Sequence, residues 1–293
     1  MNSFPGARKF LLVALPFTVA LVLSAFLAAT ASAGGKVNLN DGIELSANYR
    51  TWDVTADAGG CISVVKYGYS PAVDSSFDSQ SDAFDGGLLL VSENRPFHTR
   101  AFRAGTTGDL SGNQLTVGPA SFAGFKVTRQ DRALPSGILR SLVKLENKAK
   151  KPKSATLALD SGLGSDSSTG VRKASNGSKM TKASRWVVTS DSPTTPNDPV
   201  ITMAFYGKGK PKVKVRSLPL GQPRPSVDCL TVDLGKVKIG ARNTGYLLFF
   251  TELNSTNQAG ISAAKKYDKK TLNSQLLAGL SKGVKKKILN WDL

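Results

Sequence analysis

Two stretches of the chain combine aspartates with serines and glycines and could bind a hard cation. The first runs from Asp74 to Gly87 and the second from Asp160 to Thr169. Carboxylate and hydroxyl oxygens on a loop are the ligands that Ca²⁺ prefers. The alternative is a pair of polar turns, because Asp and Ser are common turn residues and no bidentate Glu closes either stretch. The candidate ligands for a structural Ca²⁺ ion, the one cofactor that the sequence indicates, are Asp78, Asp82, Asp85 and Asp166.

The chain has two cysteines, Cys61 and Cys229, which could form one disulfide. Both lie in apolar, strand-like surroundings, and an exported protein can keep a disulfide. The alternative is two buried free thiols. A bridge between these cysteines would close a long loop, which in the chain-entropy model stabilises a fold by about 4–5 kcal/mol.

Residues that could perform catalysis are scarce. The single histidine, His98, lies in a segment from Arg95 to Arg100 with no neighbour that would orient its ring, and one histidine excludes a multi-His metal centre. The sequence has no GxSxG, HExxH, Walker or GxGxxG motif. Paired carboxylates for glycoside chemistry stay open, because such pairs form in space and not in sequence. Glutamate occurs only at Glu44, Glu93, Glu146 and Glu252.

Positive charge is concentrated in the second half of the chain. Residues 34–139 hold 9 basic and 11 acidic residues, whereas residues 140–293 hold 28 and 10. Clusters of lysine carry this excess, among them Lys148, Lys150, Lys151 and Lys153, then Lys173, Lys179 and Lys182, and finally Lys285, Lys286 and Lys287. Lysine suits a diffuse field more than bidentate recognition. We therefore expect association with anionic envelope polymers, glycans or membrane surfaces, in which Lys285–Lys287 take part. No aromatic-and-basic module indicates specific nucleic-acid recognition.

The first 33 residues are typical of a secretory signal. Arg8 and Lys9 precede an apolar run from Phe10 to about Ala29, and Ala31–Ala33 supplies the small residues that signal peptidase needs. Cleavage near Ala33 would make the protein secreted or extracytoplasmic. The alternative is an uncleaved anchor, because roughly 20 apolar residues can span a bilayer.

The elements that must position these residues are β-strands, over a domain from 34 to 255. Short runs of Val, Ile, Leu, Thr, Phe and Tyr alternate with Gly, Pro, Asn, Asp and Ser clusters, and no helical pattern separates them. This pattern predicts an all-β fold, a large antiparallel β-sandwich, with the supersandwich arrangement as an open alternative. The predicted strands cover 43–54, 61–67, 88–91, 97–103, 114–117, 122–129, 138–146, 155–160, 185–189, 200–206, 212–217, 229–234 and 246–253.

Residues 256–293 change character and predict a short α-helical tail that packs on the sandwich. We expect helices over 259–269, 272–280 and 282–290, with Ser281 as the N-cap of the last. The alternative is a membrane-binding helix, but amphipathic helices usually pack on a core. The apolar residues of the tail recur at spacings of three and four and are Leu276, Leu277, Leu280, Val284, Ile288 and Trp291.

Several short motifs resemble those of a family of exported bacterial β-rich domains that has no assigned activity. They are, in order, Asn38–Gly42, the Asp-Ala-Phe-Asp-Gly-Gly run at 82–87, Leu163–Asp166 with Thr169, Arg185–Val188, Gly279–Ser281 and Ile288–Trp291. The chain also resembles the large sandwiches of carbohydrate-active proteins, including mutarotase-like ones. That second resemblance implies catalytic His and acidic residues, but a two-His arrangement does not match a chain whose single histidine is His98.

Two classes of function follow from these observations. The sequence favours an exported, non-enzymatic binding or structural domain that associates with an envelope polymer, a glycan or another protein through its basic surface. The alternative is a carbohydrate-active enzyme of sandwich architecture that uses paired carboxylates. An aromatic-lined cleft with two facing carboxylates would distinguish the enzyme from the binding domain.

Overall fold

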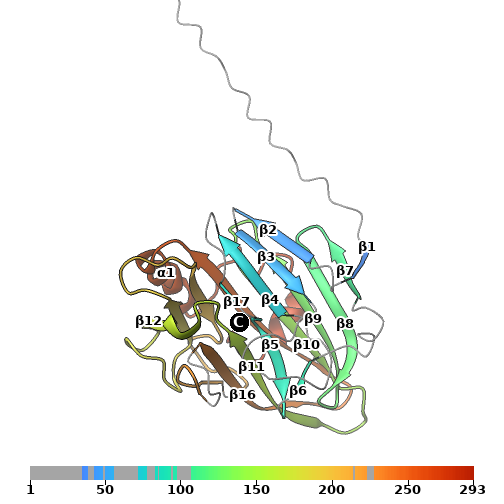
Figure 1. Ribbon diagram of the computed structural model, residues 1–293. Helices are drawn as coiled ribbons and strands as arrows, with labels where there is room; N and C mark the ends of the chain where they lie inside the picture. The colour runs from blue at the N-terminus through green and yellow to red at the C-terminus, as the bar shows by residue number, and fades with distance from the viewer. Residues whose placement is uncertain are drawn as a thin grey trace, which may run out of the picture. The chain divides into compact units, whose positions relative to one another are not determined.

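The computed structural model describes residues 35–38, 43–48, 50–55, 72–77, 83–84, 86–93, 95–97, 107–213, 215–222 and 228–293. Within these ranges the strands form three sheets whose ladders are all antiparallel, and the two α-helices lie near the C-terminus (Figure 1). The predicted fold class, an antiparallel β-sandwich with a short C-terminal helical tail, is confirmed. The predicted signal segment, together with Cys61 and His98, lies outside the described residues.

The first layer is a nine-stranded sheet. In spatial order its strands are β1 (Gly35–Asn38), β7 (Thr107–Ser111), β8 (Gln114–Phe122), β9 (Phe125–Ala133), β10 (Leu139–Glu146), β17 (Thr244–Asn254), β14 (Val200–Ala204), β13 (Trp186–Ser190) and β12 (Gly170–Ala174). Strands β7 to β10 follow one another in the chain, and β17 then pairs between β10 and β14. The centre of this sheet is therefore assembled from segments far apart in sequence.

The second layer consists of a five-stranded and a three-stranded sheet. The five strands, in spatial order, are β15 (Arg216–Ser217), β16 (Cys229–Ile239), β11 (Lys153–Gly162), β5 (Leu89–Ser92) and β6 (Arg95–Pro96). The three strands are β2 (Ile43–Ala47), β3 (Arg50–Thr55) and β4 (Ala72–Phe77). One core joins the layers, because Trp52, Leu159 and Phe249 from the three sheets belong to the same buried cluster.

The nine-stranded sheet is buried on both faces along its centre. In β17, Leu247 and Phe249 face the core between the layers, whereas Leu248 and Phe250 face a second cluster on the outer side of the sheet. Successive side chains of a strand point to opposite faces, so a strand covered on both sides reads as a continuous apolar run. This explains the unbroken hydrophobic stretch from Tyr246 to Phe250 in the sequence.

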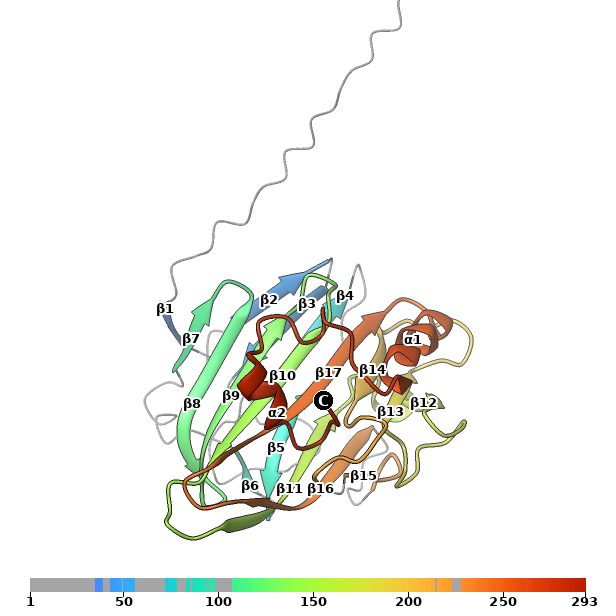
Figure 2. The same ribbon diagram turned by 180° about the vertical axis from the view of Figure 1, so that it is seen from behind.

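The C-terminal segment supplies the cover for the outer face. It contains α1 (Asn257–Ala264), a 3₁₀ turn (Lys265–Asp268) and α2 (Lys282–Lys286), and its apolar residues pack on β10, β13, β14 and β17 (Figure 2). The predicted cap is confirmed, since the Ser281 hydroxyl accepts from the Val284 N–H at 3.2 Å. No helix in the part of the chain that the structure describes is long and apolar enough to cross a membrane.

The helix predicted over 272–280 is wrong, because this segment forms successive turns. Its backbone hydrogen bonds span three residues, as in Leu276 N–H to Asn273 at 3.1 Å. The buried guanidinium of Arg140 donates instead to the carbonyls of Leu276, at 3.3 Å, and Ala278, at 2.6 Å. Carbonyl groups that would accept hydrogen bonds within a helix therefore accept them from the Arg140 guanidinium on the sheet. Burial and the charge of Arg132 lower the pKa of Arg140 to about 10.

Other strands differ from the prediction in extent. The predicted strand 43–54 is a hairpin that turns at Asn48, where φ is 50°. In the described part of the predicted strand 212–217, only β15 is a strand, although Val213 and Val215 are buried, as their alternation with cations predicted. Strands β1, β4, β7 and β12 were not predicted, because they are short and carry few apolar residues. The predicted strand 61–67 lies outside the described ranges.

The described half of the predicted disulfide is Cys229, which is buried at the start of β16 and is not a free thiol. Because Cys61 lies outside the described residues, the pair stays a prediction. We expect thiol labelling of the denatured, unreduced protein to find no free thiol, and labelling after reduction to find both. Two thiols labelled before reduction would contradict the disulfide.

Candidate functional site

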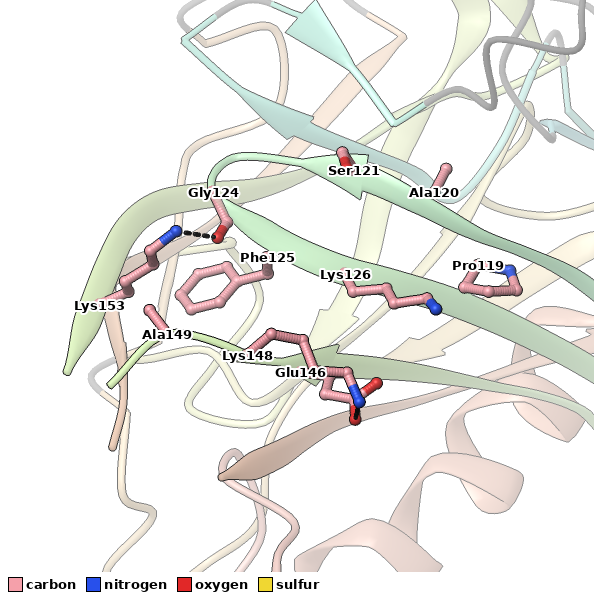
Figure 3. Close-up of a pocket in the computed structure, with 10 residues that line it drawn as sticks. All are labelled: Pro119, Ala120, Ser121, Gly124, Phe125, Lys126, Glu146, Lys148, Ala149 and Lys153. Carbon is pink, nitrogen blue, oxygen red and sulfur yellow. Dashed lines mark hydrogen bonds and ion pairs between the residues drawn. The ribbon is translucent and has the colours of Figure 1, made fainter. Parts of the chain in front are cut away.

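A pocket of about 500 Å³ opens where the β8–β9 hairpin meets the loop that joins β10 to β11 (Figure 3). Its walls come from β8, β9, the end of β10 and the start of β11, so both layers of the sandwich contribute. The lining residues are Pro119, Ala120, Ser121, Gly124, Phe125, Lys126, Glu146, Lys148, Ala149 and Lys153. Three of them are cationic and one is anionic, which makes the lining positive by two charges.

Backbone geometry shapes the hairpin wall. The hairpin turns through Ala123 and Gly124, with φ angles of 51° and 80°, as in the tight turns whose twist matches that of the flanking strands. Further along β8 the register shifts between Val117 and Ala120. Gly118 has a φ of 100° there, and a Cβ at this position would lie 2.7 Å from the carbonyl oxygen of Val127, so glycine is required. This bulge places Pro119 and Ala120 in the wall.

Asn147 anchors the opposite wall. Its side-chain amide donates to the carbonyls of Lys151, at 2.9 Å, and Gly240, at 2.8 Å. Its side-chain oxygen accepts from the N–H of Ala149 at 3.0 Å. Asn147 is buried, and a buried amide with these partners holds the loop in one conformation. The loop therefore presents Lys148 at a defined place beside the end of β10.

The second lysine of this wall ties the two walls together. The Lys153 ammonium, at the start of β11, donates to the carbonyl of Gly124 at the tip of the hairpin, at 3.1 Å (Figure 3). Lys153 as a whole is exposed to solvent. An ammonium has three donors, so this contact leaves two for a ligand.

The electrostatics of the pocket centre on Glu146. The Lys148 ammonium lies 2.5 Å from one carboxylate oxygen and the Lys144 ammonium lies 3.6 Å from the other. The hydrogen bond from Lys148 and the charges of Lys144, Lys148 and Lys126 lower the pKa of Glu146, and desolvation opposes them in part. The carboxylate therefore stays ionised, as the single negative group among surrounding lysines.

This lining can hold an anion but lacks a pair of catalytic carboxylates. Among the ten lining residues Glu146 is the only acid, whereas glycoside hydrolysis uses two carboxyl groups across the scissile bond. Of the other glutamates, Glu252 is buried against Lys266, at 2.7 Å, and the Tyr267 hydroxyl, at 2.5 Å. Its carboxylate is thus occupied in fixing the C-terminal segment to β17. Glu44 and Glu93 are exposed elsewhere.

The two acidic stretches of the sequence meet in the structure. Phe84 forms a β-bridge with Leu163, and the Gly164 N–H donates to the Ala83 carbonyl at 2.9 Å. Asp166 is exposed at the start of a 3₁₀ turn, Asp166–Ser168. The other candidate Ca²⁺ ligands, Asp78, Asp82 and Asp85, lie outside the described residues. Within the described ranges no three His, Cys, Asp or Glu side chains are grouped to hold a metal, and the Ca²⁺ site stays a prediction.

The lysines singled out in the sequence lie on α2 and directly after it. Lys286 and Lys287 are exposed and Lys285 is partly so. The residues of the pocket itself were not predicted as a site, although the basic cluster from Lys148 to Lys153 was the sequence signal for one wall. Nothing in the sequence indicated that the β8–β9 hairpin would form the other wall.

No protein-family model and no curated protein sequence matches the chain. Solved structures with some similarity include a polysaccharide lyase, with 10% identity over 75% of this chain and 35% of that one and a TM-score of 0.40. A heparinase III gene product has 12% identity over 71% and 33%, with a TM-score of 0.41. The heparan sulfate lyase of Pedobacter heparinus has 9% identity over 71% and 33%, with a TM-score of 0.37. The chain thus spans about a third of the length of these structures.

Proposed function

We propose that the protein is a binding module for an anionic glycan, which it holds in the pocket between the β8–β9 hairpin and the 147–152 loop. The observation that carries this proposal is the lining: Lys126, Lys148 and Lys153 surround a hollow whose one carboxylate, Glu146, is already paired with lysine. The net positive charge of this lining would attract a negatively charged group into the hollow. The export signal predicted over residues 1–33 would bring the module to the anionic polymers of the cell envelope.

The shape and chemistry of the pocket favour an acidic sugar over a membrane surface or a nucleic acid. The volume of the pocket lies in the range of pockets that bind small ligands. A flat membrane surface would not fill such a hollow. Pro119, Ala120 and Ala149 offer apolar contact for a sugar ring, and Ser121 and Glu146 can hydrogen-bond its hydroxyls. Phe125 is only 2% exposed and cannot stack on a nucleobase, as single-strand nucleic-acid binders require.

Replacing Lys148 and Lys153 together by glutamine should weaken binding to polygalacturonate. Exposed ion pairs contribute about 0.2–1 kcal/mol each, so the double variant should lose about 0.4–2 kcal/mol, or about 2–30-fold in Kd. Glu146→Gln should change the affinity in the opposite direction, because it releases Lys148 and Lys144 from their carboxylate. Titration calorimetry at low salt measures both changes, and added salt should reduce binding by all variants.

The matched control is Lys173→Gln with Lys179→Gln, which removes the same charge from exposed positions away from the pocket. Uncharged dextran, anionic lipid vesicles and duplex DNA serve as comparison ligands. The proposal is wrong if the pocket and control variants lose the same affinity, if dextran binds equally well, or if binding to polygalacturonate persists unchanged at about 1 M salt, where the Debye length is about 3 Å. It is also wrong if vesicles or DNA bind more tightly and lose that binding in the pocket variant.

A further inference from the structure

The outer face of the nine-stranded sheet is divided into an apolar and a polar end. At the apolar end, Leu142, Leu248 and Phe250 are covered by the C-terminal segment. At the polar end, directly opposite residues form two rows across the strands. One row contains Ser121, Lys126, Glu146 and Thr244, and the other contains Thr128, Lys144 and Tyr246. Opposite residues of an antiparallel pair share one face, so both rows lie on the outer face with the pocket at one end.

The C-terminal segment extends these rows beyond β17. The Tyr246 N–H donates to the Lys287 carbonyl at 3.0 Å, and the Leu289 N–H donates to the Tyr246 carbonyl at 2.8 Å. These two bonds make Ile288 the lateral neighbour of Tyr246, with Lys287 directly before it in the chain, and Tyr246 itself pairs with Lys144. Figure 2 shows α2 on this same outer side, over β10 and β17. From β9 to the segment at Lys287 there are three strand spacings, or about 14 Å.

Side chains along this path are positive and accessible. Lys126, Lys286 and Lys287 are exposed, and the side chain of Lys144 is 39% exposed. Between them lies Tyr246, which is partly exposed. Burial and the charge of Glu146 raise the pKa of Tyr246, so its hydroxyl stays protonated and can donate to an anion. A ligand that extends from the pocket in this direction meets the ammonium of Lys126 on β9, that of Lys144 on β10 and the hydroxyl of Tyr246 on β17.

We infer that the pocket and the residues Lys126, Lys144, Tyr246 and Lys285–Lys287, here called the basic track, form one continuous site for a linear polyanionic glycan. One charged unit occupies the pocket and the following units lie along the track towards α2. This inference rests on the proposed function and extends it, because a single acidic sugar would use the pocket alone. The ligand is thus a chain with a charge on consecutive units, held along its length.

The test compares galacturonate oligomers of increasing length, each titrated into the wild-type protein and into variants by calorimetry. For the wild type, affinity should rise with oligomer length and then level off when the track is filled. The variant K285Q/K286Q/K287Q should bind the shortest oligomer as the wild type does, but should lose at least about threefold in affinity for the long ones. The pocket variant K148Q/K153Q should lose affinity for every length.

The matched control is K173Q/K179Q/K182Q, which removes three exposed lysines from β12 and the loop after it, on the far side of β13 and β14 from β17. An equal loss in both triple variants would overturn the track and would show only nonspecific electrostatic attraction to the positively charged protein. Equal wild-type affinity for all lengths would overturn the track but leave the pocket proposal standing. Absence of wild-type binding to any oligomer would overturn both. Thermal melting of each variant checks that the sandwich remains folded.

Discussion

Replacing Asp131 by alanine should lower the free energy of unfolding by about 3–5 kcal/mol, which is among the largest effects expected for a single substitution in this chain. The Asp131 carboxylate accepts from Arg129 at 2.7 and 3.2 Å and from the Ser141 hydroxyl at 2.5 Å, and Asp131 and Arg129 are 0% and 2% exposed. Arg129 also donates to the Leu88 carbonyl, at 2.7 Å, so it joins β9 to the opposite layer. Without the carboxylate, the buried Arg129 cation loses an ion-pair partner.

The control for this prediction is the double variant Arg129→Met with Asp131→Leu. A buried ion pair replaced by apolar residues of similar volume is often neutral or stabilising, because neither charge is then left alone. Urea unfolding should therefore give a much smaller loss for the double variant than for Asp131→Ala. A loss below about 1 kcal/mol for the single variant would show that the pair does not hold the two layers together.

Replacing Trp291 by alanine should lower the free energy of unfolding by about 3–5 kcal/mol. Trp291 is 3% exposed, its indole N–H donates to the Leu248 carbonyl at 2.8 Å, and its ring meets Phe250 edge-on with 5.6 Å between the centroids. Alanine removes this packing from the outer cluster and leaves a cavity over β17. The C-terminal segment should then be cleaved by protease earlier than the rest of the sandwich.

Two substitutions separate the packing of Trp291 from its position near the C-terminus. Trp291→Phe keeps an aromatic ring against Phe250 but loses the hydrogen bond, so it should cost clearly less than the alanine variant. Leu293→Ala should have little effect, because Leu293 is 39% exposed. Equal losses for Trp291→Ala and Leu293→Ala would contradict the view that the tryptophan anchors the segment to the sheet.

The fold class could be predicted because the strands that build the core carry apolar residues at alternate positions. The run from Leu139 to Leu145 alternates, and in the structure Leu139, Val143 and Leu145 face the core between the layers. The tail was predicted to be more helical than it is. The spacing of Leu276, Leu277 and Leu280 shows that these side chains lie on one apolar face, but successive turns can place them there as well as a helix can. Carbonyls turned towards Arg140, which lies more than a hundred residues earlier, decide that conformation.

The pocket could not be predicted because its geometry depends on distant pairing. Lys126 and Glu146 become neighbours only through the register of β9 and β10. The bulge at Gly118 and the anchor at Asn147 then place the two walls, and neither leaves a periodic signal in the sequence. Lysines of a local run, such as Lys148 to Lys153, can be recognised as a cluster, but a cluster becomes a site only when another segment faces it.

The position of β17 in the nine-stranded sheet has a consequence for the order in which the chain can fold. This strand pairs with β10 and β14 at the centre of the sheet, yet it follows β14 by about forty residues and β10 by about a hundred. Until it arrives, β10 and β14 each present an unpaired edge, the kind of edge that associates with other chains. Closing the sheet depends on contacts of long sequence separation, which form slowly. A chain that emerges N-terminus first would therefore have its two half-sheets open until β17 appears.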